Sequence, residues 1–133
     1  AQLLANCGVQ ALPELHAPEE LYDVWPDSLV FGRQFDLAVF PWMTGATPPC
    51  DLYLSGNVPS EDYPGGSNDT GYSNPDYDAA CQSALSAFDA ATRRAGQVEA
   101  QRLFAQDLPA LPLFFRPKVG PAANTVLGYQ LDA

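Results

Sequence analysis

The fold is predicted from one stretch of sequence, Phe-Asp-Leu-Ala-Val-Phe-Pro-Trp, at residues 35–42. Its four consecutive apolar residues, 37–40, are bounded by loop signals, a pattern typical of a β-strand that is covered on both faces. Pro41 cannot donate a ladder hydrogen bond, so the strand is expected to end there. Trp42 then leads into a polar loop at the C-terminal edge of the strand, where α/β sheets usually bind ligands. Trp42 is therefore either a core residue or a ligand contact.

Composition limits the class of protein. The chain has 133 residues, of which 47% are apolar, and this argues for one globular domain. Sixteen acidic residues against six basic ones give a net charge of −10, which argues against nucleic acid and anionic membranes as partners. The sequence has no apolar run of about 18 residues, so no membrane span is predicted. No signal peptide is visible at Ala1, which leaves a mature chain or a piece of a longer protein.

The N-terminal part predicts short elements and one long loop. Residues 1–7 resemble the last turns of a helix that ends at Gly8, and residues 9–12 resemble a short strand. A brief helix is expected over residues 17–24, because a proline and two glutamates suit its first turn. Residues 43–73 are rich in glycine, proline and small polar residues, yet they contain apolar anchors. We expect an ordered loop that packs over the edge of the sheet.

Two longer helices follow. Asn74 can cap the first helix and Pro75 suits its first position. Its apolar residues follow 3.6-residue spacing at Tyr77, Ala80, Cys81, Ala84, Leu85 and Phe88. The second helix is expected over residues 91–107, with Gly96 weakening its start by about 1 kcal/mol relative to alanine.

The buried sides of these helices define an expected core. On the second helix, the residues expected to be buried are Val98, Leu103, Phe104, Ala105 and Leu108. Phe40, Leu85, Phe88 and Leu113 are expected to be buried together, because the strand and the two helices have no other apolar surface to pack against.

The sequence shows no recognisable catalytic or metal-binding motif. The one histidine, His16, lies in a polar stretch, and no serine or cysteine stands in a nucleophile motif. The acidic and amide residues Asn57, Asp62, Asn68 and Asp69 do not have EF-hand spacing. We therefore expect no enzymatic activity, no metal and no cofactor.

The three cysteines allow two interpretations. Cys50 lies in a loop, Cys81 in a predicted helix, and Cys7 stands apart. A bridge between Cys50 and Cys81 would indicate an oxidising compartment. Three buried free thiols are the alternative, and the residues alone do not decide between the two.

Four segments together resemble a known family. They are the stretch at 35–42, Asn-Val-Pro-Ser-Glu at 57–61, Gly-Tyr-Ser-Asn-Pro-Asp-Tyr-Asp at 71–78, and Ala-Gln-Arg-Leu-Phe-Ala-Gln-Asp-Leu-Pro-Ala-Leu-Pro-Leu-Phe-Phe-Arg-Pro at 100–117. In this order and spacing they resemble the C-terminal part of family 5 extracellular solute-binding proteins. These are the receptors of oligopeptide and dipeptide ABC importers. The resemblance extends from Leu3 to about Gly128.

The resemblance implies a fold and a function. Members are several times longer and fold into two lobes with a ligand cleft between them. Residues 1–112 would form most of the C-terminal α/β lobe of a type II periplasmic-binding-protein-like fold, a mixed sheet flanked by helices. Residues 113–133 would cross back toward the other lobe. The implied function is capture of a peptide or similar small solute for delivery to a membrane permease; the alternative is a small secreted disulfide-containing interaction domain.

The resemblance also implies location and site residues. Export to the periplasm or cell exterior favours the Cys50–Cys81 bridge, with a lipid anchor at an upstream N-terminus as one option. In peptide-binding members an aspartate soon after the tryptophan pairs with the peptide ammonium. Here Trp42 is followed by Met43, Thr44, Gly45 and Ala46, and the first carboxylate is Asp51. The predicted ligand contacts are thus Trp42 and residues 43–46, without recognition of a free peptide N-terminus.

Overall fold

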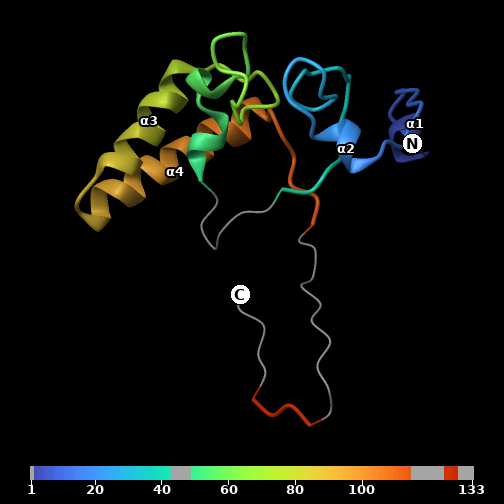
Figure 1. Ribbon diagram of the computed structural model, residues 1–133. Helices are drawn as coiled ribbons and strands as arrows, with labels where there is room; N and C mark the ends of the chain where they lie inside the picture. Colours follow the sequence, from blue (N-terminus) through green and yellow to red (C-terminus); the bar gives the residue numbers. More distant parts are fainter. Residues whose placement is uncertain (1, 43–48, 115–124, 129–133) are drawn as a thin grey trace.

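The computed structural model describes residues 2–42, 49–114 and 125–128. Figure 1 shows a hairpin of two long helices on one side of the molecule and short N-terminal elements on the other. The N-terminal elements are α1 (Gln2–Asn6) and α2 (Pro18–Leu21). Two 3-10 helices follow, η1 (Cys50–Tyr53) and η2 (Ser55–Asn57), and then the hairpin of α3 (Pro75–Ser86) and α4 (Ala90–Asp107).

The prediction of an α/β lobe with a mixed sheet is wrong. The described residues form four α-helices and two 3-10 helices, and no strand. In the stretch at 35–42 the side chains of Leu37 and Val39 are 71% and 81% exposed. An extended segment becomes a strand only when a second backbone supplies its hydrogen-bond ladder, and an apolar run by itself does not provide one. The strand expected at residues 9–12 is absent for the same reason.

The hairpin confirms the predicted helix start at Asn74. The Asn74 side chain accepts hydrogen bonds from the backbone amides of Asp76, at 2.9 Å, and Tyr77, at 3.2 Å. The other end of the hairpin returns to the same point. Asp107 Oδ2 accepts from the Tyr72 hydroxyl and from Asn74 Nδ2, each at 2.7 Å. These two bonds lower the pKa of Asp107 below its usual value and join the end of α4 to the start of α3.

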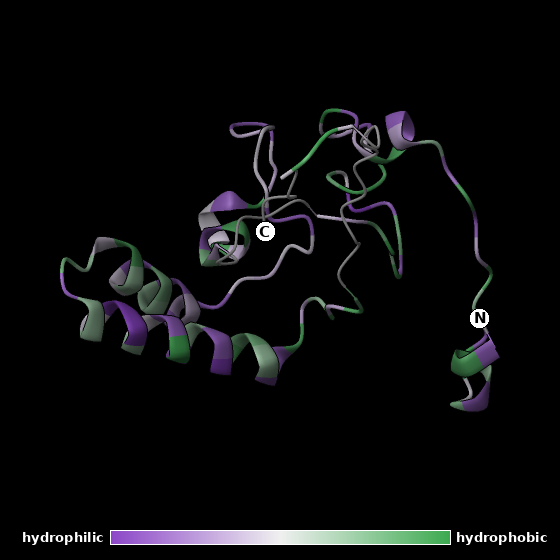
Figure 2. Cartoon of the chain, turned by 90° about the horizontal axis from the view of Figure 1, so that it is seen from below, coloured by the Kyte–Doolittle hydropathy of each residue, from purple (hydrophilic) through white to green (hydrophobic). Residues whose placement is uncertain are grey.

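The expected core of Phe40, Leu85, Phe88 and Leu113 is wrong. Leu85 is 59% exposed, Leu113 is 62% exposed, and Phe88, between the two helices, is fully exposed. The buried residues are Tyr77, Cys81, Ala100 and Leu103, packed against Tyr53, Tyr72 and Phe104 among others. On α4, Val98 and Ala105 are exposed, as is Leu108 just after its end, whereas Leu103 is buried as expected. Figure 2 shows hydrophobic and hydrophilic residues alternating along both helices of the hairpin.

Gly96 explains this choice of buried face. A Cβ atom at Gly96 would lie 2.8 Å from the carbonyl oxygen of Ala80 and 2.8 Å from the amide nitrogen of Ala84. At this point the two helices therefore approach so closely that no side chain at position 96 fits between them. Helix α4 runs unbroken from Ala90, one residue before its expected start, and the energetic cost of Gly96 stays a prediction. Gly96 is required by helix packing.

Two N-terminal predictions are confirmed. Helix α1 ends before Gly8, which has a φ of +82° as expected of a residue that follows a helix. Helix α2 begins at Pro18, although it ends at Leu21, earlier than expected. The predicted division of the chain at residues 112 and 113 stays a prediction, because most of residues 113–133 lie outside the described part.

The bridge between Cys50 and Cys81 is confirmed. The two Cα atoms are 5.7 Å apart and the sulfur atoms are bonded, while Cys7 is free and exposed. The bond joins η1 to the middle of α3, and the Tyr77 hydroxyl reinforces this contact by donating to the Cys50 carbonyl at 2.6 Å. An internal disulfide is typical of proteins from oxidising compartments.

Candidate aromatic binding site

The site is built on a turn that precedes the stretch at 35–42. Ser28, which is fully buried, donates its hydroxyl hydrogen to the Leu21 carbonyl at 2.6 Å and accepts from the Phe31 amide at 3.0 Å. These bonds fix residues 21–31 into a compact turn with Val30 buried beneath it. The turn therefore holds Tyr22 and Phe31 in place without a regular helix or strand.

Trp42 belongs to an aromatic cluster that consists of Tyr22, Phe31, Phe40 and Trp42. The Trp42 ring lies 5.9 Å from the Phe40 ring and 6.3 Å from the Phe31 ring, and Tyr22 lies 6.1 Å from Phe40. The Tyr22 hydroxyl also donates to the Pro41 carbonyl at 3.2 Å. Trp42 keeps 37% of its surface exposed. It is thus a positioned aromatic ring that still has free surface for a ligand.

Tyr53 connects this cluster to the helical hairpin. Burial raises the pKa of Tyr53 to about 12, the Asp69 carboxylate adds to this, and a side-chain hydrogen bond with Trp42 acts against it. Because tryptophan can only donate, the indole N–H must be the donor. On its other side the Tyr53 ring lies 4.7 Å from the Phe104 ring of α4. Trp42 is therefore attached to the core through one intermediate ring.

Asp69 is a buried acid that the sequence did not single out for this site. It is 1% exposed, and its Oδ1 atom has no hydrogen-bond partner among the described residues. Burial raises the pKa of Asp69 from 3.8 to about 6, although the backbone amides of Asp69 and Thr70 partly oppose this. In the sequence, only its position next to Asn68 could have drawn attention to Asp69. Asp69 is too deeply buried to contact a ligand in this structure, but its charge acts on Tyr53.

Asp69 leads to a prediction about pH. Because the folded state binds the Asp69 proton more tightly than the unfolded state does, protonation stabilises the fold below about pH 4, and this contribution is lost as the pH rises through about 6. Asp69→Asn is therefore expected to be more stable than the wild type above about pH 6 and to lose that advantage near pH 4. Urea unfolding across this range measures the difference. Asp62→Asn, on an exposed part of the same loop, controls for net charge. A difference between Asp69→Asn and wild type that does not change with pH contradicts the assignment.

The other predicted site residues have separate outcomes. Met43, Thr44, Gly45 and Ala46 lie outside the described residues, so their role stays a prediction. The Nδ1 atom of His16, just before α2, donates a hydrogen bond to the Glu20 carboxylate in α2 at 3.0 Å. The described residues contain no cluster of histidine, cysteine or acidic side chains suited to a metal ion. Within the same part of the chain, no helix combines the length and the hydropathy needed to cross a membrane.

Comparisons of the chain with protein-family models, curated proteins and solved structures found no match.

Proposed function

We propose that this chain contributes one wall of a solute-binding site in the receptor of an ABC importer, and that Trp42 is the main contact with the solute. The receptor captures a peptide or similar small solute outside the cytoplasm and delivers it to a membrane permease. The single observation that supports this most is the Trp42 ring, which Phe31, Phe40 and Tyr53 hold in place while 37% of it stays exposed. A ring positioned in advance loses little entropy when a ligand stacks on it.

The proposal rests on this site and on the motif order, and it does not use the predicted sheet. The motifs at 71–78 and 100–117 contain the cap of α3 and the end of α4. In this chain their side chains Tyr72 and Phe104 pack against the Tyr53 ring system that leads to Trp42. The motifs that resemble the receptor family thus support the same aromatic ring that is proposed to bind the solute.

Trp42→Ala is expected to weaken solute binding by at least about tenfold, since a central aromatic contact usually contributes that much. The measurement is calorimetry with a mixture of peptides on the complete receptor that the proposal requires. Trp42→Phe, which keeps an aromatic ring, serves as the matched control and should retain most of the affinity. Because no carboxylate follows Trp42 before Asp51, N-terminal acetylation of the peptides should change affinity little. Unchanged affinity in Trp42→Ala contradicts the site, and loss of binding on acetylation contradicts the claim about the N-terminus.

A small secreted interaction domain is the second candidate. One observation favours it: the main hydrophobic core and the disulfide lie together within residues 50–104. The DNA upstream of the coding sequence separates the two candidates. A receptor requires a long coding region in frame before this chain, whereas a small domain requires its own signal sequence there.

A further inference from the structure

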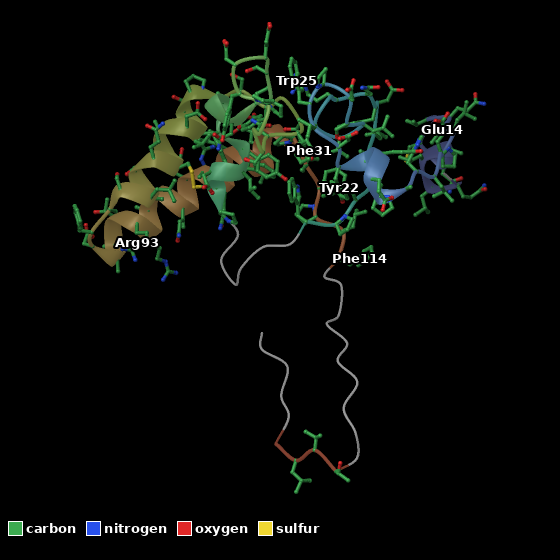
Figure 3. The ribbon with its side chains drawn as sticks, in the orientation of Figure 1. Glu14, Tyr22, Trp25, Phe31, Arg93 and Phe114 are labelled. Atoms are coloured by element: carbon green, nitrogen blue, oxygen red, sulfur yellow. A yellow bond between two sulfur atoms is a disulfide. The ribbon has the colours of Figure 1, made fainter. Side chains whose placement is uncertain are left out.

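An open hollow of about 220 Å³ lies beside the aromatic cluster. It is lined by Tyr22–Val24, Phe31 and Pro64–Gly66, and we call it the aromatic hollow. Tyr22 and Phe31 belong both to the hollow and to the cluster that contains Trp42. Figure 3 shows the two side chains close together on the N-terminal half of the molecule, where it meets the loop before α3. A ligand in the hollow would therefore lie next to the proposed solute contact.

The packing and hydrogen bonding of Gly66 hold the Pro64–Gly66 side of the hollow in place. A Cβ atom at Gly66 would lie 2.4 Å from the Asn57 carbonyl oxygen and 2.8 Å from the Pro59 nitrogen, so the loop packs tightly at this point. The Gly66 amide also donates to the Tyr63 carbonyl at 3.3 Å. On the near wall, the bond between the Tyr22 hydroxyl and the Pro41 carbonyl holds the tyrosine.

Asp23 gives the hollow its charge. Among the described residues that line the hollow, it is the one that carries a charge. Its Oδ1 atom accepts a hydrogen bond from the Val24 amide at 2.7 Å, and among the described residues Asp23 forms no ion pair. Arg33 does not line the hollow, and its guanidinium contacts the Pro59 carbonyl at 3.5 Å. The chain as a whole carries a net charge of −10, which further favours a cation at this position.

We propose that the aromatic hollow binds a guanidinium group, with the rings of Tyr22 and Phe31 as its walls and the Asp23 carboxylate as its counter-charge. A guanidinium is planar and weakly hydrated, stacks on aromatic rings, and pairs with carboxylates through two parallel hydrogen bonds. An ammonium ion is more strongly hydrated and lacks the planar shape, so it would use the two rings less well. This inference rests on the proposed function in one respect: it names the class of solute, or of solute side chain, for the site beside Trp42.

The test uses the complete 133-residue chain, labelled with ¹⁵N, and two ligands of nearly the same shape. N-acetyl-arginine amide carries the guanidinium, and N-acetyl-citrulline amide replaces it with a neutral urea group. We expect the arginine ligand to shift the amide signals of residues 22–24, 31 and 64–66 with a Kd of about 1–10 mM, as suits one exposed charge pair with two ring contacts. The citrulline ligand should bind at least about fivefold more weakly.

Two variants identify the charge. Asp23→Asn keeps an oxygen that can accept from the Val24 amide but removes the charge, and it should weaken the arginine ligand by at least about fivefold. Asp27→Asn makes the same change at an exposed position of the same turn that does not line the hollow, and it should change binding by less than about twofold. Both positions are exposed, so both variants should fold, and the spectra report this directly.

Three results would overturn the inference: no shifts at the hollow with up to about 20 mM ligand, equal binding of the two ligands, or equal effects of the two variants. None of these would affect the proposed function, which depends on loss of solute binding in Trp42→Ala. Conversely, the arginine ligand could bind as expected while Trp42→Ala leaves the solute affinity of the receptor unchanged. That result would support the hollow and contradict the proposed role of Trp42.

Discussion

Reduction of the Cys50–Cys81 disulfide is expected to lower the free energy of unfolding by about 3–4 kcal/mol. The two cysteines are separated by 31 positions in the sequence. Without the bond, the unfolded chain gains the freedom of a loop of that size, and this entropy is the main source of the loss in the chain-entropy model. A domain of this size is typically stable by only about 5–15 kcal/mol, so the reduced protein should unfold at much lower urea concentration.

The measurement is urea unfolding with and without reductant. Thiol titration in denaturant gives the matching chemical count: one reactive thiol per chain without reductant, from Cys7, and three with it. Cys7→Ala is the control variant, because Cys7 is exposed and should leave the unfolding midpoint unchanged while removing the single thiol. Equal midpoints for the oxidised and reduced protein would show that the bond does not stabilise the fold.

Asn68→Ala is expected to cost about 2–5 kcal/mol of stability, because it removes the four hydrogen bonds of this side chain and takes the Asn68 donor away from the Tyr72 carbonyl, whereas the Leu54 carbonyl keeps its bond from the Asn57 amide. The Asn68 side chain is fully buried. Its Nδ2 atom donates to the Leu54 carbonyl at 3.0 Å and to the Tyr72 carbonyl at 2.8 Å. Its Oδ1 atom accepts from the Thr70 hydroxyl at 3.0 Å and from the Tyr72 amide at 3.2 Å. One side chain therefore joins η1 and η2 to the segment that leads into α3.

The matched variant for this prediction is Asn68→Asp. It preserves the shape and the oxygen that Thr70 and Tyr72 use, but it replaces the donor that faces two carbonyl oxygens with an acceptor. We expect Asn68→Asp to be at least as damaging as Asn68→Ala at neutral pH, whereas a cavity effect alone would make it mild. Thermal and urea unfolding measure both. The exposed substitution Asn6→Ala in α1 should stay within about 0.5 kcal/mol of the wild type.

Local chemistry explains the predictions that the structure confirms. The helix that begins after Asn74, the end of α1 before Gly8 and the start of α2 at Pro18 each depend on residues adjacent in the sequence. Capping oxygens, proline at the first position and a glycine with positive φ act over one turn, so the sequence alone predicts them. The Cys50–Cys81 bond is different, since it came from the resemblance and not from local pattern.

The burial of the helix faces was decided only by the tertiary structure. Helical spacing placed Tyr77, Cys81 and Ala84 on one stripe with Leu85 and Phe88, and no periodicity could divide that stripe. The hairpin buries the first three and exposes the last two. Gly96 lets the two helices approach closely at Ala84, and the next residue of α3, Leu85, is 59% exposed. Near Gly96 the buried residue of α3 is the small Ala84, whereas the large ring of Tyr77 is buried against Tyr72 and Phe104.

Trp42 and the stretch before it show the same division. The sequence identified 35–42 as apolar and extended, and it identified Trp42 as a large aromatic residue at the end of that stretch. Whether the stretch becomes a strand depends on a second backbone beside it, and the described residues bring none. Whether Trp42 is core or contact depends on the turn held by Ser28, which presents Phe31 to it while leaving 37% of its surface exposed. Both the pairing of the stretch and the contact of Phe31 with Trp42 depend on residues that are distant in the sequence, so neither could be predicted from the sequence.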